Sequence, residues 1–415
     1  MNKYMTASVL GCCVSPVFAD APVVLTPLID SRLRWEDVTQ GGKPDVADAV
    51  TARVRMGLEA KFPDKLSILA EATGTLALDN NYYNATPKSG GSAALFPAIV
   101  DPQTIGLNRL QLQYQGIAGT VVTVGRQRIN FDDERFVGSA GWRDNEQTFD
   151  AVRIESMPIK HLKADITYAW DDNTVFGIDG QTGVGTGHIQ GDNVFGTLGY
   201  TTPVGTLEGF GYVVNQTALT RAKFSSATFG GRFAGKYAFN RATNISYTVA
   251  YANQRDDKLA PTRFSTSYYF GEAYLNSHGW SAGGGYELLG ADNAAQIKMT
   301  GLNSTTAFQT PLATLHKWNG WADIFLVTPT NGLADAYTSL GYTKSKIGPF
   351  DSLGATLIYH DYHADIGAGA YGREWDAQLR AIRSKYVILI KYAGYTATGF
   401  ATNTRKFWVS LEWKY

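Results

Sequence analysis

The sequence predicts an all-β protein, a transmembrane antiparallel β-barrel of about 18 strands with short periplasmic turns and long extracellular loops. Polar and apolar side chains alternate with a period of two over most of the chain, and short and long links alternate between these segments. No run approaches the roughly 20 apolar residues that a transmembrane helix needs. Strands that cross a membrane must close into a barrel, because lipid cannot hydrogen-bond their backbone groups.

The last eleven residues, RKFWVSLEWKY, show the alternation clearly. Apolar Phe407, Val409, Leu411, Trp413 and Tyr415 alternate with Lys406, Trp408, Ser410, Glu412 and Lys414, which are mostly polar. Chain ends usually fray, so such a pattern at a terminus indicates a strand that pairs with the first one to close the barrel. The terminal Tyr415 also resembles the aromatic signal that the barrel assembly machinery recognises, which makes that machinery an expected partner.

Residues 1–19 have the features of a signal peptide. Lys3 is followed by an apolar stretch, and Val17-Phe18-Ala19 forms a cleavage site before Asp20. Both cysteines, Cys12 and Cys13, fall inside this segment, so the exported chain would contain none. Lipidation of Cys12 is the alternative. No linker or block of like charge divides residues 20–415, which predicts one outer-membrane β-barrel domain.

The lengths of the links set the strand count. Short links at 63–65, 115–119, 157–161, 201–205, 239–241, 276–279, 343–349 and 384 alternate with longer ones at 79–104, 131–146, 171–192, 255–263 and 363–372. The count is 18 if 291–332 is a single long loop, and 20 if that segment adds a hairpin. A barrel of this width has room for water, and we expect loop 291–332 to fold into the pore.

Arginines are concentrated on the predicted lumenal face of the early strands. They are Arg32, Arg34, Arg53, Arg55, Arg109, Arg126, Arg128 and Arg153. Guanidinium groups stay charged and bind carboxylates through two parallel hydrogen bonds, so this wall could select anionic solutes. The same region carries the acidic residues Asp30, Glu36, Glu59, Glu71 and Glu155. These leave open a second interpretation, in which the charges neutralise one another and only stiffen the wall.

Two stretches, GRQRINFDDERFVGSAGWRDNEQTFDA at 125–151 and FQTPLATLHKWNGWADIFLVTPTNGLADAY at 308–337, resemble the alginate export family of outer-membrane barrels. The resemblance implies an 18-stranded barrel with an arginine-rich constriction that passes an anionic polysaccharide or smaller solutes. It also implies which residues belong to the constriction: Arg126, Arg128, Asp132, Asp133, Arg135, Arg143, Asn145 and Asp150. His316 and Lys317 lie in the second stretch and are expected to line the pore. In one respect the chain differs from this pattern: its net charge is zero, so it lacks the strongly basic character of such a pore protein.

The expected function is an outer-membrane channel for passive diffusion or export of hydrophilic solutes. These would be anionic or sugar-like, such as uronate polysaccharides or oligosaccharides. A general nonspecific porin is one alternative. An enzyme or adhesin built on the barrel is another, because His188, His278 or His316 could each lie near a serine. We expect no catalytic residues, cofactor or metal, no nucleic-acid partner, and outer-membrane lipid around the barrel; the spacing of His360 and His363 alone is weak evidence for a metal site.

Overall fold

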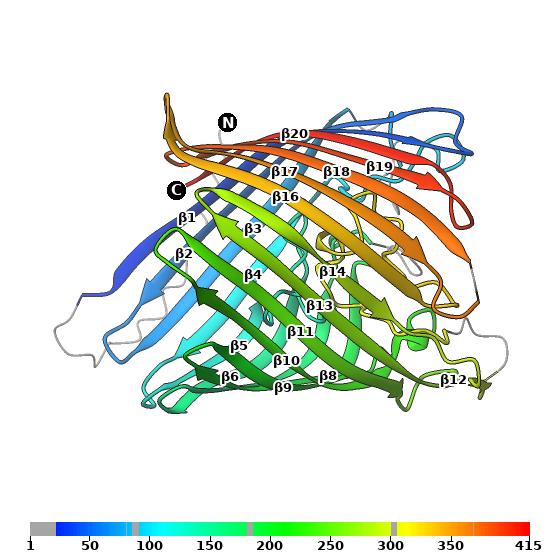
Figure 1. Ribbon diagram of the computed structural model, residues 1–415. Coiled ribbons are helices and arrows are strands. Elements are labelled where there is room, and N and C mark those ends of the chain that lie inside the picture. The colour runs from blue at the N-terminus through cyan, green and yellow to red at the C-terminus, as the bar shows by residue number, and fades with distance from the viewer. Residues whose placement is uncertain (1–21, 80, 85–90, 181–185, 300–304, 368) are drawn as a thin grey trace, which may run out of the picture.

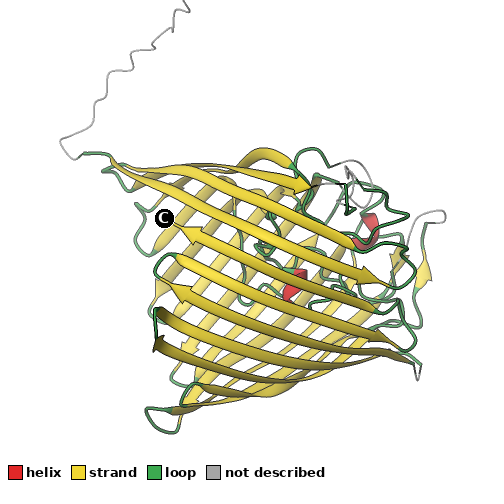
Figure 2. Cartoon of the chain, turned by 90° about the horizontal axis from the view of Figure 1, so that it is seen from above, coloured by secondary structure: helices red, strands yellow, loops and turns green. Residues whose placement is uncertain are grey.

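The computed structural model describes residues 22–79, 81–84, 91–180, 186–299, 305–367 and 369–415. The predicted signal peptide, residues 1–19, lies outside these ranges. Eighteen antiparallel strands form one closed sheet, as the sequence predicts, and Figures 1 and 2 show its strongly tilted strands. Within the described ranges, no helix is both long and apolar enough to cross a membrane.

The first nine strands of the barrel are β1 (Val24–Gln40), β2 (Ala47–Lys61), β3 (Leu66–Asp79), β4 (Thr104–Tyr114), β5 (Thr120–Gln127), β6 (Thr148–Ile159), β7 (Leu162–Asn173), β8 (His188–Thr202) and β9 (Gly205–Val214). The other nine are β10 (Ser226–Ala238), β11 (Thr243–Asp256), β13 (Ser265–Ser277), β14 (Trp280–Leu289), β16 (Leu333–Ile347), β17 (Phe350–His363), β18 (Ala370–Arg383), β19 (Tyr386–Ala397) and β20 (Thr404–Lys414). Two short strands, β12 (Thr262–Arg263) and β15 (Gln296–Ile297), pair only with each other, so the barrel count stays at 18. The short 3-10 helices are η1 (Ala222–Phe224) and η2 (Leu315–Lys317).

The first and last strands close the barrel. β20 pairs with β1 over the full length of β20, from Lys414 opposite Asp30 to Thr404 opposite Gln40. The backbone N–H of Tyr415 adds a hydrogen bond of 2.9 Å to the carbonyl oxygen of Ile29. The C-terminal strand is therefore paired on both edges, because β19 holds its other side.

The alternation predicted from sequence separates two faces of the sheet. In β1, Leu33 is 48% exposed on the outside, whereas Arg32 and Arg34 are 4% and 2% exposed on the lumenal side. In β20, Leu411 lies outside and Trp408 is fully buried within the lumen. An apolar exterior around a polar interior is the arrangement of a barrel that is surrounded by lipid.

The lumen is partly filled by two of the long links, which carry apolar side chains inward. The first link, residues 128–147, contributes Phe131 and Val137 to a buried cluster, and residues 305–332 contribute Phe308, Leu312 and Phe325. These side chains pack against lumenal aromatic residues of the strands. Burial of this apolar surface is what holds the links inside the barrel.

The apolar exterior leads to a prediction about Leu357, which lies at the middle of β17 on the outer face. Leu357→Arg should destabilise the barrel by about 2–4 kcal/mol, because it places a charge at the depth of the bilayer midplane. Urea unfolding in phospholipid vesicles measures this loss. The matched control is Leu275→Arg near the short-turn end of β13, where about 0–1 kcal/mol is expected. Equal losses at both positions would contradict this membrane placement.

Candidate functional site

The chain leaves the barrel wall at the end of β5 and crosses the lumen before it returns at β6. Residues 128–147 therefore form an inward segment. Its far end reaches β1 and β2, which lie four and three strands from β5 along the wall, and there the Arg32 guanidinium donates to Asp144 at 2.7 Å. A second ion pair joins Arg55 to Glu146 at 3.1 Å, and Arg34 donates to the backbone oxygen of Trp142 at 2.7 Å. The lumenal arginines of the first two strands thus anchor this segment.

Asp144 is buried, yet it is held in its charged form. Burial by itself would raise the pKa of the Asp144 carboxyl, but Arg34 and Arg32 outweigh this and hold the pKa well below its usual range. Its backbone N–H donates to Asp101 at 2.6 Å, and Asp101 also pairs with Arg34. Since the folded pKa is depressed, this stabilisation is complete above the unfolded value of about 3.9 and disappears only as the pH falls through the lower folded value.

The second inward segment, residues 305–332, is bound to the first through Asp323. Its carboxylate accepts from Arg143 of the first segment at 2.8 Å and from Lys406 of β20 at 2.7 Å. His316 Nδ1 lies 2.7 Å from the same carboxylate, and its ring stacks on Trp142 at 4.4 Å between centroids. Burial lowers the pKa of His316 strongly, with Asp323 opposing and Lys391 adding to the shift, so the imidazole is neutral near pH 7.

Arg135 joins both segments to the opposite wall. Its guanidinium donates to Glu287 of β14 at 2.6 Å, to Thr310 at 2.9 Å and to Asn319 at 3.2 Å. Burial would lower the pKa of Arg135, but Glu287 raises it above its ordinary value. The two inward segments consequently bridge the lumen from β1 and β2 to β14.

Two cavities lie on either side of residues 139–143. The upper cavity, of about 270 Å³, is on the side of the long links and is lined largely by apolar groups such as Pro311, Leu312 and Val327, with Arg143 and His316 at its edge. The lower cavity, of about 210 Å³, lies toward the short turns. Ser139 and Gly141 border the lower cavity, whereas Ala140 and Trp142 border the upper one. Residues 139–143 therefore lie between the two cavities, which makes them the candidate constriction.

The lower cavity has a cationic excess. Its cationic lining residues are Arg32, Arg53, Arg55, Arg128 and Lys414, and its anionic ones are Asp30, Glu146 and Glu412. The Nε donors of Arg53 and Arg55 are buried and have no protein acceptor. An anion in this cavity would find unused N–H groups as well as positive charge.

Most of the remaining predicted pore residues also face the lumen but are paired. Among the arginines, Arg109 binds Glu71 at 2.7 Å and Arg153 binds Asp165 at 2.6 Å, while Arg128 binds both Glu71 at 3.2 Å and Glu146. On the inward segment, Asp133 binds Arg232 at 2.8 Å and Asp132 lies against Glu208. Lys317 donates to the backbone oxygen of Asp133 at 2.8 Å. The lumenal arginines of β1, β2, β4 and β6 lie on one side of the barrel, but β3 contributes none. Much of the charge of these arginines is neutralised by carboxylates, many of them on the inward segment.

Arg126 and Asp150 lie on the other face of the sheet, contrary to the prediction from sequence. Arg126 is directly opposite Leu110, which is exposed on the outside, and its guanidinium binds Asp150 at 2.7 Å. Gln127 and Phe149, one residue further on, point inward and are buried. Arg126 and Arg128 share parity in the sequence, but β5 ends between them, so the alternation no longer relates their directions.

Sequence reasoning missed the acidic residues that face the arginine wall, namely Asp101, Asp144, Glu146 and Asp323. One signal was present. Asp144 and Glu146 are two residues apart, as are Arg53 and Arg55, and an extended segment with this spacing can pair with a strand of the same period. Nothing in the sequence indicated that the segment would turn into the lumen and reach those arginines.

The alginate export family model matches residues 36–173. This range covers β2 to β7 and the first inward segment. No curated protein sequence matches the chain. The family model confirms the resemblance of the stretch at 125–151, whereas the stretch at 308–337 lies outside the matched range.

Solved structures of outer-membrane porins share the fold. Pseudomonas aeruginosa OpdK with vanillate matches with a TM-score of 0.67 and 11% identity, over 94% of this chain and 98% of that one. OccK11 (OpdR) of the same organism matches with a TM-score of 0.65 and 12% identity, over 94% and 95% of the two chains. Acinetobacter baumannii OccAB1 gives 0.65 and 12%, over 94% and 96%. The chain is an integral outer-membrane β-barrel with a porin-like fold.

The anchoring of the inward segment leads to a prediction for Asp144→Asn. The substitution leaves Arg32 without its buried partner, and removal of one member of a buried ion pair costs about 3–5 kcal/mol. The segment should loosen, so single-channel recordings should show a larger and noisier current. Asp64→Asn, in an exposed short turn, is the control and should record like the unmodified protein. Wild-type current from Asp144→Asn would show that this ion pair does not hold the constriction.

Proposed function

We propose that the barrel is a channel for passive diffusion of small anionic solutes, above all carboxylates with an apolar part. The observation that carries this proposal is the lower cavity, where cationic groups exceed carboxylates and the Nε donors of Arg53 and Arg55 lack protein acceptors. An anion that enters this cavity exchanges part of its hydration for these N–H groups. Selectivity then arises from fixed charge and from the width of the constriction.

The two cavities suggest an order of events along the path. A solute from outside first meets the upper cavity, whose apolar lining and Trp142 suit the hydrocarbon part of the solute. It then passes residues 139–143, where Arg143 offers the next positive charge, and reaches the arginines of the lower cavity. The similar porin OpdK was solved with vanillate, a small aromatic carboxylate, which supports this class of solute.

The packing inside the lumen favours small solutes over a polymer. Phe308 and Leu312 of the second inward segment and Val137 of the first are buried in the lumenal cluster. A polysaccharide strand would have to displace these side chains and the ion pairs at Asp323. We therefore favour monomeric or short uronates and other carboxylates over export of uronate polysaccharide.

The barrel assembly machinery and outer-membrane lipid are the other partners that we propose. Tyr415 is 62% exposed at the end of β20, so its ring is accessible for recognition during assembly. Outward leucines such as Leu340 and Leu379 supply the surface that meets lipid.

The proposal predicts that Arg53→Gln/Arg55→Gln lowers anion selectivity. In planar bilayers with a KCl gradient, the zero-current potential should show anion preference for the unmodified protein, and the chloride-to-potassium permeability ratio should fall roughly twofold or more in the variant. Liposome swelling should also show glucuronate moving faster than glucose, with this difference reduced in the variant. Both effects follow from loss of positive charge in the lower cavity.

Two further variants make this test specific. Arg53→Lys/Arg55→Lys keeps the charge while it removes the guanidinium donors, so selectivity for chloride should remain. Arg373→Gln changes an exposed arginine beside Asp361 and should leave selectivity unaltered. Conductance without anion preference would favour the general porin, and absence of conductance would favour the enzyme or adhesin alternatives.

A further inference from the structure

The barrel wall contains a notch beside the start of β4. Residues 104–109 of this strand pair with β3, but β5 reaches only as far as Leu110 because it ends at Gln127. The chain that would have continued the wall is the inward segment. In place of a strand, Arg126 reaches across and donates to the backbone oxygen of Leu107 at 3.3 Å.

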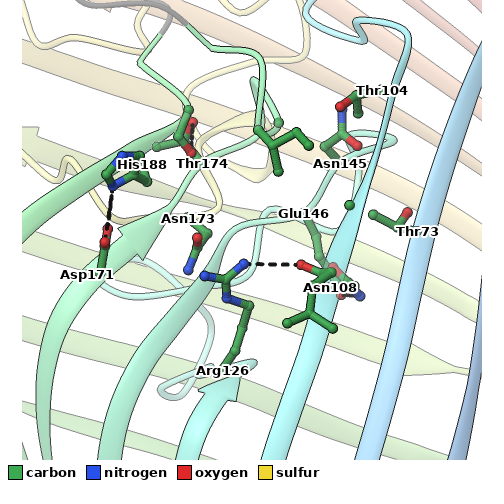
Figure 3. A pocket seen from close by; sticks show the side chains of 15 residues that line it. Thr73, Thr104, Asn108, Arg126, Asn145, Glu146, Asp171, Asn173, Thr174 and His188 are labelled. Atoms are coloured by element: carbon green, nitrogen blue, oxygen red, sulfur yellow. Dashed lines mark hydrogen bonds and ion pairs between the residues drawn. The ribbon is translucent and has the colours of Figure 1, made fainter. Parts of the chain in front are cut away.

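A cavity of about 300 Å³ occupies this notch (Figure 3). Thr73, Asn145 and Glu146 line it from the lumenal side, whereas Arg126, Asp171 and His188 line it from the outer side. One cavity thus contacts both faces of the sheet. It borders both other cavities, because it shares Thr174 with the upper one and Glu146 with the lower one.

The charged groups of the notch already have partners. Arg126 binds Asp150 at 2.7 Å, Glu146 binds Arg55 at 3.1 Å, and Asp171 lies 3.1 Å from His188. A charged ligand would have to compete with these contacts. The notch therefore does not favour either an anion or a cation.

Three uncharged polar side chains of the notch lack partners, whereas the other three, Asn108, Asn173 and Thr174, are hydrogen-bonded to protein. The hydroxyls of Thr73 and Thr104 are buried without a hydrogen bond to protein, and so are both amide atoms of Asn145, which is 3% exposed. Buried polar groups are normally satisfied, so these three side chains indicate a missing ligand that both donates and accepts. The apolar side chains of Leu107 and Ile178 border the same space.

We propose that the notch binds a neutral sugar ring. Closely spaced hydroxyls can donate to Asn145 Oδ1 and accept from its Nδ2 and from the two threonines, while the C–H face of the ring contacts Leu107 and Ile178. The cavity has the size of a small-ligand site. The sugar comes either from free saccharide on the loop side or from the glycan of an outer-leaflet glycolipid, which reaches the outer mouth of the notch.

Saturation-transfer NMR on the purified full-length protein in detergent tests this with D-glucose and D-galactose as free probes. A second arm measures retention of lipopolysaccharide, with lipid A lacking the core sugars as its reference, by native mass spectrometry. Thr73→Val/Thr104→Val removes the two hydroxyls without change of shape. We expect about tenfold weaker binding by this variant, since two hydrogen bonds are lost.

Thr75→Val is the matched control, because Thr75 is also a buried, unpaired threonine of β3 but does not line the notch. It should bind like the unmodified protein. Heat-modifiable migration on gels shows that all variants are folded barrels. Sugar binding that only the double variant loses supports the proposal, and the arm in which it occurs identifies the source. No binding in either arm, or equal binding by the double variant, would overturn the sugar proposal and indicate that only water fills the notch.

Discussion

The inward course of the chain after Gln127 is the feature on which the rest of the site depends. The segment is held by Asp144 and Glu146 against the lumenal arginines of β1 and β2. Because residues 128–147 leave the wall, they supply the constriction between the two cavities and at the same time open the notch beside β4. One local departure from the sheet therefore produces both features.

Buried ion pairs add little net stability to such a segment, and here they determine its position. Removing the charges of Arg32 and Asp144 from water carries a large desolvation penalty, which their attraction only partly offsets. The apolar side chains of the two inward segments supply the favourable burial, and the ion pairs fix where the segments lie. The same pairing explains why an arginine-rich wall coexists with a net charge of zero.

The fold could be predicted from sequence because successive side chains of a strand point to opposite faces. In this chain, apolar residues on the lipid face alternate with charged and polar residues on the lumenal face. Leu33 and Arg34 are adjacent in sequence and lie on opposite faces, as the alternation requires. The prediction failed where the alternation was interrupted. Arg126 faces outward with its neighbour Leu110, and Arg128 does not share this face because β5 ends at Gln127. Arg109 faces the lumen through an irregularity at Asn108 that places two successive residues inside. The acidic partners of the wall depend on contacts between segments more than 100 residues apart, such as Arg32 with Asp144, which no local pattern reveals.

Under the proposed function, residues 139–143 stand in a water-filled path with a preference for anions. Gly141→Cys tests it directly, because Gly141 borders the lower cavity and an added side chain there meets open space. Both native cysteines lie in the predicted signal peptide, so the new thiol would be the reactive one in the exported chain. In planar bilayers, a negatively charged methanethiosulfonate reagent should react faster than a positively charged one and should reduce the current. Equal rates for the two reagents, or modification that leaves the current unchanged, would contradict the account.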